Sequence, residues 1–304
     1  MFLEDYIYNL SKTSIDKSQP LWDLHLFNLR SPESEAVGVF RLHHSFGDGT
    51  SLMSLLLACI RQTKDPLALP TIPVKMKQEK KDDDRWFWRI MFMLWSLFQV
   101  FRNTVVDVFM FIATTLFLKD TQNPLKGPPR SEFNPRRIVY RAVRLDDIKL
   151  TINDVALGIT QAGLSRYINR IYGTIHYTMF VDRKKRSFEA IFTFSIAELA
   201  LKIFGVKTAS TLSHRILSHT TMSFSNLVGP LEEIGFYGHP LAFLAPSSYS
   251  QPHALMTNFQ SYIDKMAIVL SVDDGTNPNP HQLCEDIVES LRLIKDAVVT
   301  RGLA

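Results

Sequence analysis

The sequence predicts an α/β fold, and three observations support this class. Short apolar segments typical of strands, such as 36–42, precede stretches with an apolar residue every three or four positions, such as 48–63. Of the 304 residues, 46% are hydrophobic and 21% are charged, which is typical of a globular chain. One segment, 86–118, is much more apolar than the rest and indicates a helical insert.

The N-terminal elements are a short helix and a pair of strands. The helix is expected over 3–11, and the first strand lies within 18–29, where Trp22, Leu24 and Leu26 alternate with polar residues. His25 is one of those polar residues, and we expect it to face outward without a special role. The second strand, 36–42, is apolar enough to be buried.

The segment RLHHSFGDGTS (41–51) follows that second strand and leads into a helix with Asp48 at its N-terminus. Neighbouring side chains of a strand point to opposite faces, so His43 and His44 cannot share one role. One imidazole can face a cleft and accept a proton near neutral pH. Asp48 can anchor the turn through local backbone or a buried cation, and Gly49 permits a backbone that a side chain would resist. The alternative is an ordinary buried strand with two surface histidines.

A charged linker, 75–85, leads into the apolar segment 86–118. Crossing a bilayer takes about 20 apolar residues. The two uncharged runs here are shorter, because Arg102, Asn103 and Asp107 separate them. This pattern favours one or two amphipathic helices in the membrane interface, with tryptophans near the headgroups. A buried helical hairpin covering the sheet and a single membrane span are the alternatives.

The second half continues the alternation. We expect strands at 138–143, 172–180, 241–245 and 266–272, and helices starting near 146, at Asn153 and at Pro280. Asn153 and Asp154 are predicted to cap their helix.

The strand predicted at 220–230 carries a second candidate group. Ser225 and Asn226 are neutral hydrogen-bond donors close to the turn at Gly229 and Pro230. Such donors can stabilise an oxyanion that develops during acyl transfer. The alternative is a strand-end turn whose polar groups are satisfied by its own side chains.

Five segments together carry a resemblance to a known family. HHSFGDG matches the HHxxxDG motif of acyl-CoA-dependent acyltransferases with the chloramphenicol-acetyltransferase-like fold. With the other four, the chain resembles the plant wax ester synthase/diacylglycerol acyltransferase family over nearly its whole length. Those four segments are PLWDLHL (20–26), TINDVALGITQAGLSRYINR (151–170), TMSFSNLVGP (221–230) and SYIDKMAIVLSVDDGTNPNPHQLCEDIVESL (261–291).

This resemblance implies two sheet-and-helix halves with the active site in a tunnel between them. The expected division is an N-terminal half with the motif (1–74), a charged linker with the apolar insert (75–135), and a C-terminal half (136–304). The implied reaction transfers a fatty acyl group from coenzyme A to a long-chain alcohol or a diacylglycerol, giving wax esters or triacylglycerol.

The resemblance also assigns roles to residues. His44 would be the general base, while His43 and Asp48 hold the loop in shape. Substrate-binding or supporting roles fall to Gly49, Asn153, Asp154, Ser225 and Asn226. Fatty acyl-CoA is a substrate in this reaction, so neither a bound cofactor nor a metal is expected.

Compared with that family, the chain is expected to be incomplete. The missing parts are the elements before Pro20, a few helical residues between Lys149 and Thr151, and a larger segment between Gly173 and Asp182. The second hypothesis is therefore a truncated remnant that binds membrane or lipid without turnover. A third is a soluble acyltransferase that shares only the HHxxxDG motif, and the apolar insert argues against it.

Charge and cysteine content narrow the setting. The net charge of +4 is too small to indicate nucleic-acid binding, but it suits an anionic membrane surface or acidic coenzyme A. Cys59 and Cys284 both fall in predicted helices, which indicates free thiols in a reducing compartment. The segment MFLEDYIYNLSK does not have the pattern of a secretory signal. We expect the cytosolic face of the endoplasmic reticulum membrane, with the plasma membrane as the alternative.

Overall fold

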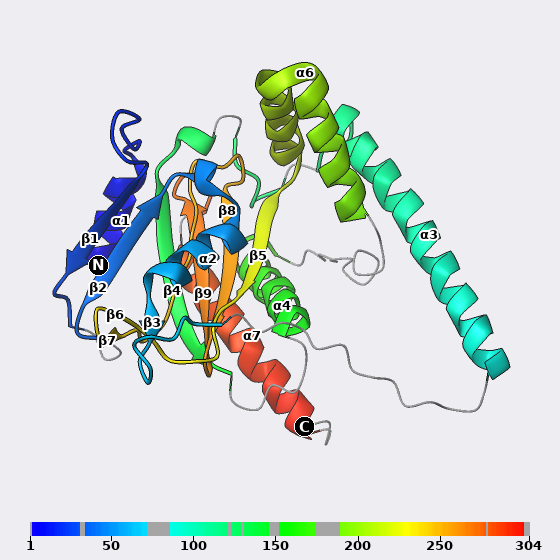
Figure 1. The fold of residues 1–304 in the computed structure, drawn as a ribbon. Coiled ribbons are helices and arrows are strands. Elements are labelled where there is room, and N and C mark those ends of the chain that lie inside the picture. Colours follow the sequence, from blue (N-terminus) through cyan, green and yellow to red (C-terminus); the bar gives the residue numbers. More distant parts are fainter. Residues whose placement is uncertain are drawn as a thin grey trace.

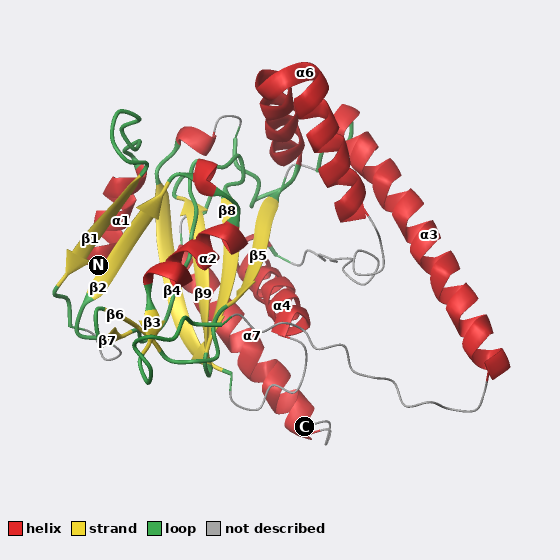
Figure 2. Ribbon diagram, viewed as in Figure 1, coloured by secondary structure: helices red, strands yellow, loops and turns green. Residues whose placement is uncertain are grey.

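A four-stranded sheet forms the centre of the molecule (Figures 1 and 2). The computed structural model describes residues 2–30, 34–71, 86–120, 123–128, 131–145, 152–173, 189–277 and 279–300. The strand order is β4-β9-β8-β5, in which β5 pairs with β8 in parallel and the other neighbours are antiparallel. These strands are β4 (Arg136–Arg144), β5 (Met222–Val228), β8 (Leu255–Tyr262) and β9 (Lys265–Asp273). The predicted α/β class is confirmed.

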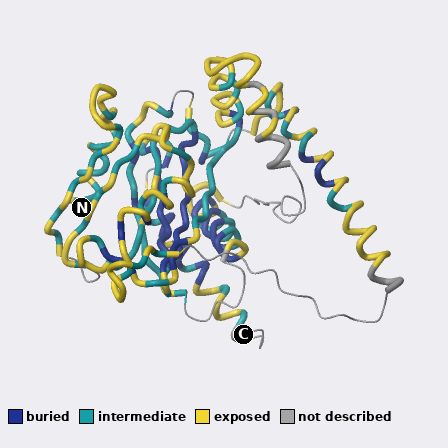
Figure 3. Tube along the Cα trace, viewed as in Figure 1, coloured by how far each residue is buried: buried dark blue, intermediate teal, exposed yellow. Residues whose placement is uncertain are grey.

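Two long helices cover one face of this sheet. They are α4 (Ile152–Tyr172) and α7 (Pro280–Thr300), which pack against each other as well as against the strands. The main core lies between them and the sheet, and Figure 3 shows the buried residues concentrated there. Its fully buried members include Val139, Ile159, Ile168, Phe259, Ile268, Leu270, Leu283 and Ile287.

The N-terminal elements lie beside the central four-stranded sheet. They are α1 (Phe2–Ser11), β1 (Trp22–Phe27), β2 (Val37–Leu42), the 3-10 turn η1 (His44–Phe46) and α2 (Gly49–Cys59). β1 and β2 form an antiparallel pair, and α1 packs on β4. β3 (Arg61–Gln62) pairs with β6 (Ile234–Phe236), which pairs with β7 (His239–Pro240). N-terminal residues therefore share a sheet with C-terminal ones, and the division at residues 74 and 135 stays a prediction.

The apolar insert folds as one helix that projects from the sheet (Figure 1). This helix, α3 (Trp86–Leu116), packs against α6 (Glu189–His219), which is kinked at Gly205. Within α3, the stretch Ile90–Leu116 is long and apolar enough to cross a membrane, judged by length and composition alone. A second 3-10 turn, η2 (Ser131–Phe133), follows α3 and leads into β4.

Several sequence expectations need correction. β2 was expected to be buried, but its residues are half-buried or exposed, because β1 and β2 form a separate two-stranded sheet. Residues 241–245 form a loop that leaves β7 without joining a sheet. β8 was not predicted, because it is buried on both faces and carries polar residues that hide the alternation typical of strands. The expected helix start near residue 146 and most of the expected strand at 172–180 lie outside the described residues.

Candidate active site

The HHxxxDG segment forms the turn between β2 and α2. The His43 amide donates to Leu21 O at 2.9 Å, after which the chain makes the η1 turn and enters α2 at Gly49. Gly47 has a φ of 148°, and a Cβ atom there would lie 2.6 Å from Ser51 Cβ. Only glycine fits this position without a rearrangement, because that φ is strained for a residue with a side chain. The predicted strand–turn–helix is confirmed, with two corrections. The glycine with the unusual backbone is Gly47 and not Gly49, which lies in the first turn of α2, and the helix ends at Cys59 instead of near residue 63 because β3 follows.

The two histidines have opposite hydrogen-bonding roles. His44 Nδ1 lies 2.8 Å from Gly47 O, and a carbonyl oxygen can only accept, so Nδ1 of a neutral His44 carries the proton. The basic lone pair of His44 is then on Nε2. His43 Nδ1 instead accepts a hydrogen bond from the Ser45 amide at 3.2 Å, so its lone pair holds the turn. The two rings thus differ in which nitrogen is free, and the roles expected for them stay predictions.

Asp48 caps the N-terminus of α2. Its Oδ1 accepts from the Ser51 amide at 2.8 Å, from Ser51 Oγ at 2.7 Å and from Thr50 Oγ1 at 2.9 Å. The hydrogen bonds from Ser51, followed by the one from Thr50, lower the pKa of Asp48 to about 2. The sequence left two anchors open for Asp48, local backbone or a buried cation, and the structure shows the bond to local backbone.

We expect Asp48→Ala to lower stability in a pH-dependent way. The pKa of Asp48 is depressed in the folded protein, so its contribution is complete above the unfolded value of about 3.9 and is lost as the pH falls toward about 2. Urea midpoints of wild type and variant should therefore differ most at pH 5–7 and converge below pH 4. A difference that does not change with pH would show that the carboxylate charge is not involved.

The start of α2 lies against the end of β5. A Cβ atom on Gly49 would be 3.4 Å from both terminal carbons of Leu227. Because strand side chains alternate, Ser225 is on the same face of β5 as Leu227. The fold therefore brings the histidine turn and the face of Ser225 to the same side of the sheet, and Figure 1 shows α2 crossing the sheet beside β5.

Asn226 lies on the opposite face of β5. Phe224, on this second face, packs into the main core, and Asn226 Nδ2 donates to Asn153 Oδ1 at 3.3 Å. Asn226 Oδ1 is buried and has no partner within the described part of the chain. Asn153 and Asp154 were expected to cap their helix, but α4 begins at Ile152, so both are in its first turn. Asn153 bonds β5 from this position.

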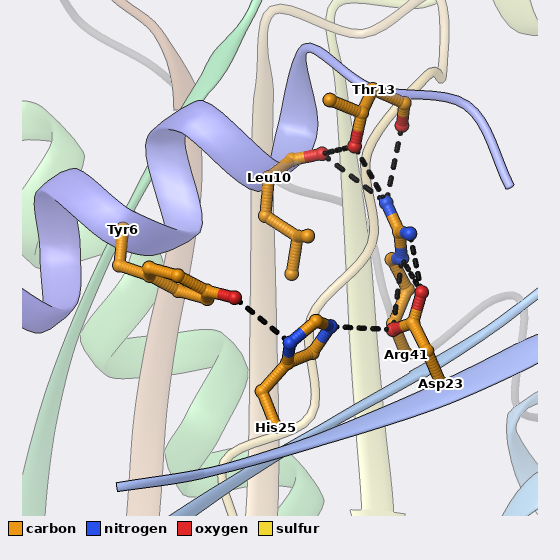
Figure 4. A network of polar contacts seen from close by, with 6 residues as sticks. All are labelled: Tyr6, Leu10, Thr13, Asp23, His25 and Arg41. Carbon is orange, nitrogen blue, oxygen red and sulfur yellow. Dashed lines mark hydrogen bonds and ion pairs between the residues drawn. The ribbon is translucent and has the colours of Figure 1, made fainter.

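A polar network that sequence reasoning missed holds β1, β2 and α1 together (Figure 4). His25 Nδ1 is 2.8 Å from Tyr6 Oη, and its Nε2 is 2.9 Å from Asp23 Oδ1. Arg41 bonds both oxygens of Asp23 and also reaches Leu10 O and the hydroxyl of Thr13. His25 is therefore not a plain outward residue. The sequence did contain a signal for this network, because Asp23 and Arg41 have opposite charges and are direct partners in the β1–β2 register.

We expect Asp23→Asn to lower stability by about 1–3 kcal/mol, because it weakens a partly buried charge pair two residues from His43. Although burial raises the pKa of Asp23, hydrogen bonds from Arg41 and His25 hold it below the ordinary value. The matched control is Glu285→Gln, which breaks the more exposed pair with Arg141 and should cost about 0.5 kcal/mol or less. Urea unfolding measures both, and equal losses would contradict a special role for the network.

Comparisons with known proteins agree with this geometry. The profile of the "Wax ester synthase/diacylglycerol acyltransferase catalytic domain" matches residues 3–160, and that of the "WS/DGAT C-terminal domain" matches 173–295. Wax ester synthase/diacylglycerol acyltransferase 5 of Arabidopsis thaliana is 40% identical, with 99% of this chain and 76% of the relative aligned. Number 11 from the same plant is 37% identical, with 99% and 78% aligned.

A solved structure supports the fold. The wax ester synthase/diacylglycerol acyltransferase from Marinobacter aquaeolei VT8 superimposes with a TM-score of 0.58, at 14% identity, over 95% of this chain and 74% of that one. The layered sheet with an HHxxxDG turn at the end of β2 defines a CoA-dependent acyltransferase. The chain belongs to the wax ester synthase/diacylglycerol acyltransferase family.

The relatives contain internal segments without a counterpart here. The alignment to the Arabidopsis relative number 5 extends over 387 positions and the alignment to number 11 extends over 380, although this chain has 304 residues. The places where the sequence suggested missing segments, near residue 150 and between 173 and 182, fall largely on residues outside the described ranges.

Proposed function

We propose that this chain transfers a fatty acyl group from coenzyme A to the hydroxyl of a long-chain alcohol or of a diacylglycerol. The family match over both halves of the chain supports this reaction. The observation that carries the assignment of the base is the contact between His44 Nδ1 and Gly47 O, because it puts the lone pair on Nε2.

In the proposed step, His44 Nε2 removes the proton of the acceptor hydroxyl. The alcohol oxygen forms a bond to the thioester carbonyl carbon, and the carbonyl oxygen becomes an oxyanion. The oxyanion collapses, the carbon–sulfur bond breaks, and the coenzyme A thiolate takes the proton from the imidazolium. The ester and free coenzyme A leave, and no acyl-enzyme forms. Such general-base catalysis typically contributes about 10²–10⁴-fold.

Ser225 is the stronger of the two candidates for stabilising the oxyanion. Its position on the face of β5 that meets α2 supports this role. Asn226 and Asn153 bond each other from β5 and α4 on the other face, and this supports a positioning role for them. His43, Asp48 and Gly49 shape the turn that presents His44.

The alternative function, a remnant that binds lipid without turnover, is not favoured. The catalytic-domain profile covers residues 3–160, and the motif turn is formed with both histidines in distinct roles. One assay separates the two hypotheses. Membranes from an expressing host without its own acyltransferases are given labelled palmitoyl-CoA with hexadecanol or diacylglycerol. Labelled ester above the level of an empty vector supports the enzyme, and its absence with folded protein present supports the remnant.

The proposed location is the cytosolic face of the endoplasmic reticulum membrane, with the plasma membrane as the alternative. Substrates with long acyl chains reside in membranes, and the length and hydropathy of α3 support attachment there. Deleting 86–118 should release folded protein from membranes into the soluble fraction, and a folded deletion variant that still sediments with membranes would contradict this attachment.

A further inference from the structure

One face of α3 is polar and covered. Asn103, Thr104 and Asp107 are 3%, 8% and 0% exposed, although they interrupt the most apolar segment of the sequence. These positions lie on one side of the helix, and α6 is the long helix that packs against α3. Two of the three residues that argued against membrane insertion, Asn103 and Asp107, are therefore covered, whereas Arg102 is exposed beside the covered face.

The opposite face of α3 is apolar and uncovered. Its side chains recur every three or four residues over about 33 Å, so they form one continuous band, which we call the apolar stripe. Each member is between 45% and 68% exposed. Figure 3 shows how little of this helix is buried. The stripe consists of Leu94, Phe98, Phe101, Val105, Phe109, Ile112 and Leu116.

The part of α6 after the Gly205 kink contacts the C-terminal end of α3. Arg215 donates to Leu116 O at 2.7 Å, and His219 Nδ1 lies 2.6 Å from Thr114 O, so α6 also satisfies carbonyls at the end of α3. Ala209, Leu212 and Ile216 are the half-buried side chains on the inner side of this part. The outer side is exposed and polar, with Lys207, Thr211, His214 and Ser218.

We propose that α3 lies within one leaflet of a lipid bilayer, with the apolar stripe in the hydrocarbon, α6 after its kink as a roof on the aqueous side, and no crossing of the membrane. A protein partner that covered the apolar stripe would be expected to form about one hydrogen bond per 100–200 Å² of interface. The stripe offers only hydrocarbon side chains over its whole length, which suits lipid tails. The occupant is therefore a bilayer surface.

The polarity of α6 argues against a crossing, although α3 has the length for one. If the middle of α3 crossed the hydrocarbon, Lys207 and Thr211 would enter the hydrocarbon too, because α6 packs against α3. A charge at the bilayer centre costs a few kcal/mol even on lenient scales. The longest uncharged parts of α3, residues 90–101 and 108–116, are about 18 Å and about 14 Å long, whereas the hydrocarbon is about 30 Å thick. Each can dip into one leaflet, but neither can traverse both.

The inference rests on the proposed function and adds the way in which lipid substrates are presented. α6 ends at His219 and β5 begins at Met222, three residues before Ser225. The helix on the aqueous side of the membrane-bound pair, α6, thus leads directly into β5, the strand of the candidate site. An acceptor dissolved in the same leaflet would be close to that strand.

Site-specific fluorescence tests the depth of each face. Exposed Cys59 is replaced by serine, buried Cys284 is kept, and single cysteines are introduced at Phe101, Phe109, Thr211 or Leu67 and labelled with a nitrobenzoxadiazole dye. Leu67 is the control, an apolar side chain that is 92% exposed in a loop outside α3. Phosphatidylcholine vesicles with 20% phosphatidylserine and brominated acyl chains should quench the dye at 101 and 109 but not at 211 or 67. Quenching at 211 equal to that at 109, or none at 109, would overturn the proposal.

Two further measurements complete the test. In sealed microsomes, Leu67→Cys and Lys119→Cys flank α3 in the sequence, and both should react with an impermeant maleimide without detergent. Protection of one of them means a crossing and overturns the proposal. Phe101→Glu with Phe109→Glu should lower the vesicle-bound fraction about tenfold or more, whereas Leu67→Glu should leave it unchanged. Undiminished binding of the double variant also overturns it.

Acyl transfer is measured on the same preparations, so the two proposals fail separately. Turnover together with a crossing pattern would keep the proposed reaction and remove the single-leaflet arrangement. The expected labelling pattern without turnover in wild type would keep the single-leaflet arrangement and remove the proposed reaction.

Discussion

Replacing His44 by alanine is expected to lower acyl transfer by about 10²-fold or more, because it removes the nitrogen that takes the acceptor proton. His44 is exposed, and its ring hydrogen-bonds Gly47 O within the same turn, so the fold should be retained. The measurement is ester formation from labelled palmitoyl-CoA per folded protein, in membranes without host acyltransferase. His239→Ala is the matched control, since it removes an exposed histidine of β7, to which no role is assigned.

Two comparisons separate a base from a structural histidine. His43→Ala removes an acceptor that holds the Ser45 amide, so it should lower both stability and activity. Wild-type turnover should fall on the acidic side of its pH profile, because a protonated imidazole cannot take the proton of the acceptor hydroxyl. Near-full activity of His44→Ala would reject its assignment as the base. No activity in wild type, with activity in a version that carries the relatives' internal segments, would favour the remnant.

Local signals explain what the sequence could predict. The strand–turn–helix around His43 and Asp48 depends on adjacent residues, namely an apolar strand, a flexible glycine turn and an N-cap side chain. The same holds for α7, whose apolar periodicity alone defines it. The insert forms one helix, α3, where the sequence predicted one or two helices, and its apolar composition was evident from the sequence.

Long-range pairing explains what was missed. β8 is buried on both faces, so Thr257, Asn258 and Gln260 look like a loop until β5 and β9 flank them. Ser225 and Asn226 were grouped as two donors, but adjacent strand residues face opposite sides. Which side faces α2 depends on the contact between Gly49 and Leu227, 178 positions apart in the chain. The role of His25 depended on Tyr6 in another element in the same way.

Two glycines of α4 should respond in opposite directions to the same substitution. A Cβ atom at Gly163 would lie 2.7 Å from the Cα and 2.9 Å from the amide nitrogen of Ile287, so backbone of α7 would have to move. A Cβ atom at Gly158 would meet only Ile294 Cδ1, at 3.9 Å. Helix propensity favours alanine over glycine at both positions, by about 1 kcal/mol. The difference between the variants therefore measures how closely the two helices approach.

We expect Gly163→Ala to destabilise the protein by about 1–3 kcal/mol, because overpacking against backbone outweighs the gain in propensity. Gly158→Ala should instead stabilise it by about 0.5–1 kcal/mol. Urea unfolding followed by circular dichroism measures both, with equal slopes required for the comparison. Because α4 also presents Asn153 to Asn226, Gly163→Ala should lower acyl transfer as well, while Gly158→Ala leaves it unchanged. Equal stabilisation by both substitutions would mean that α4 and α7 do not pack as closely as the structure places them.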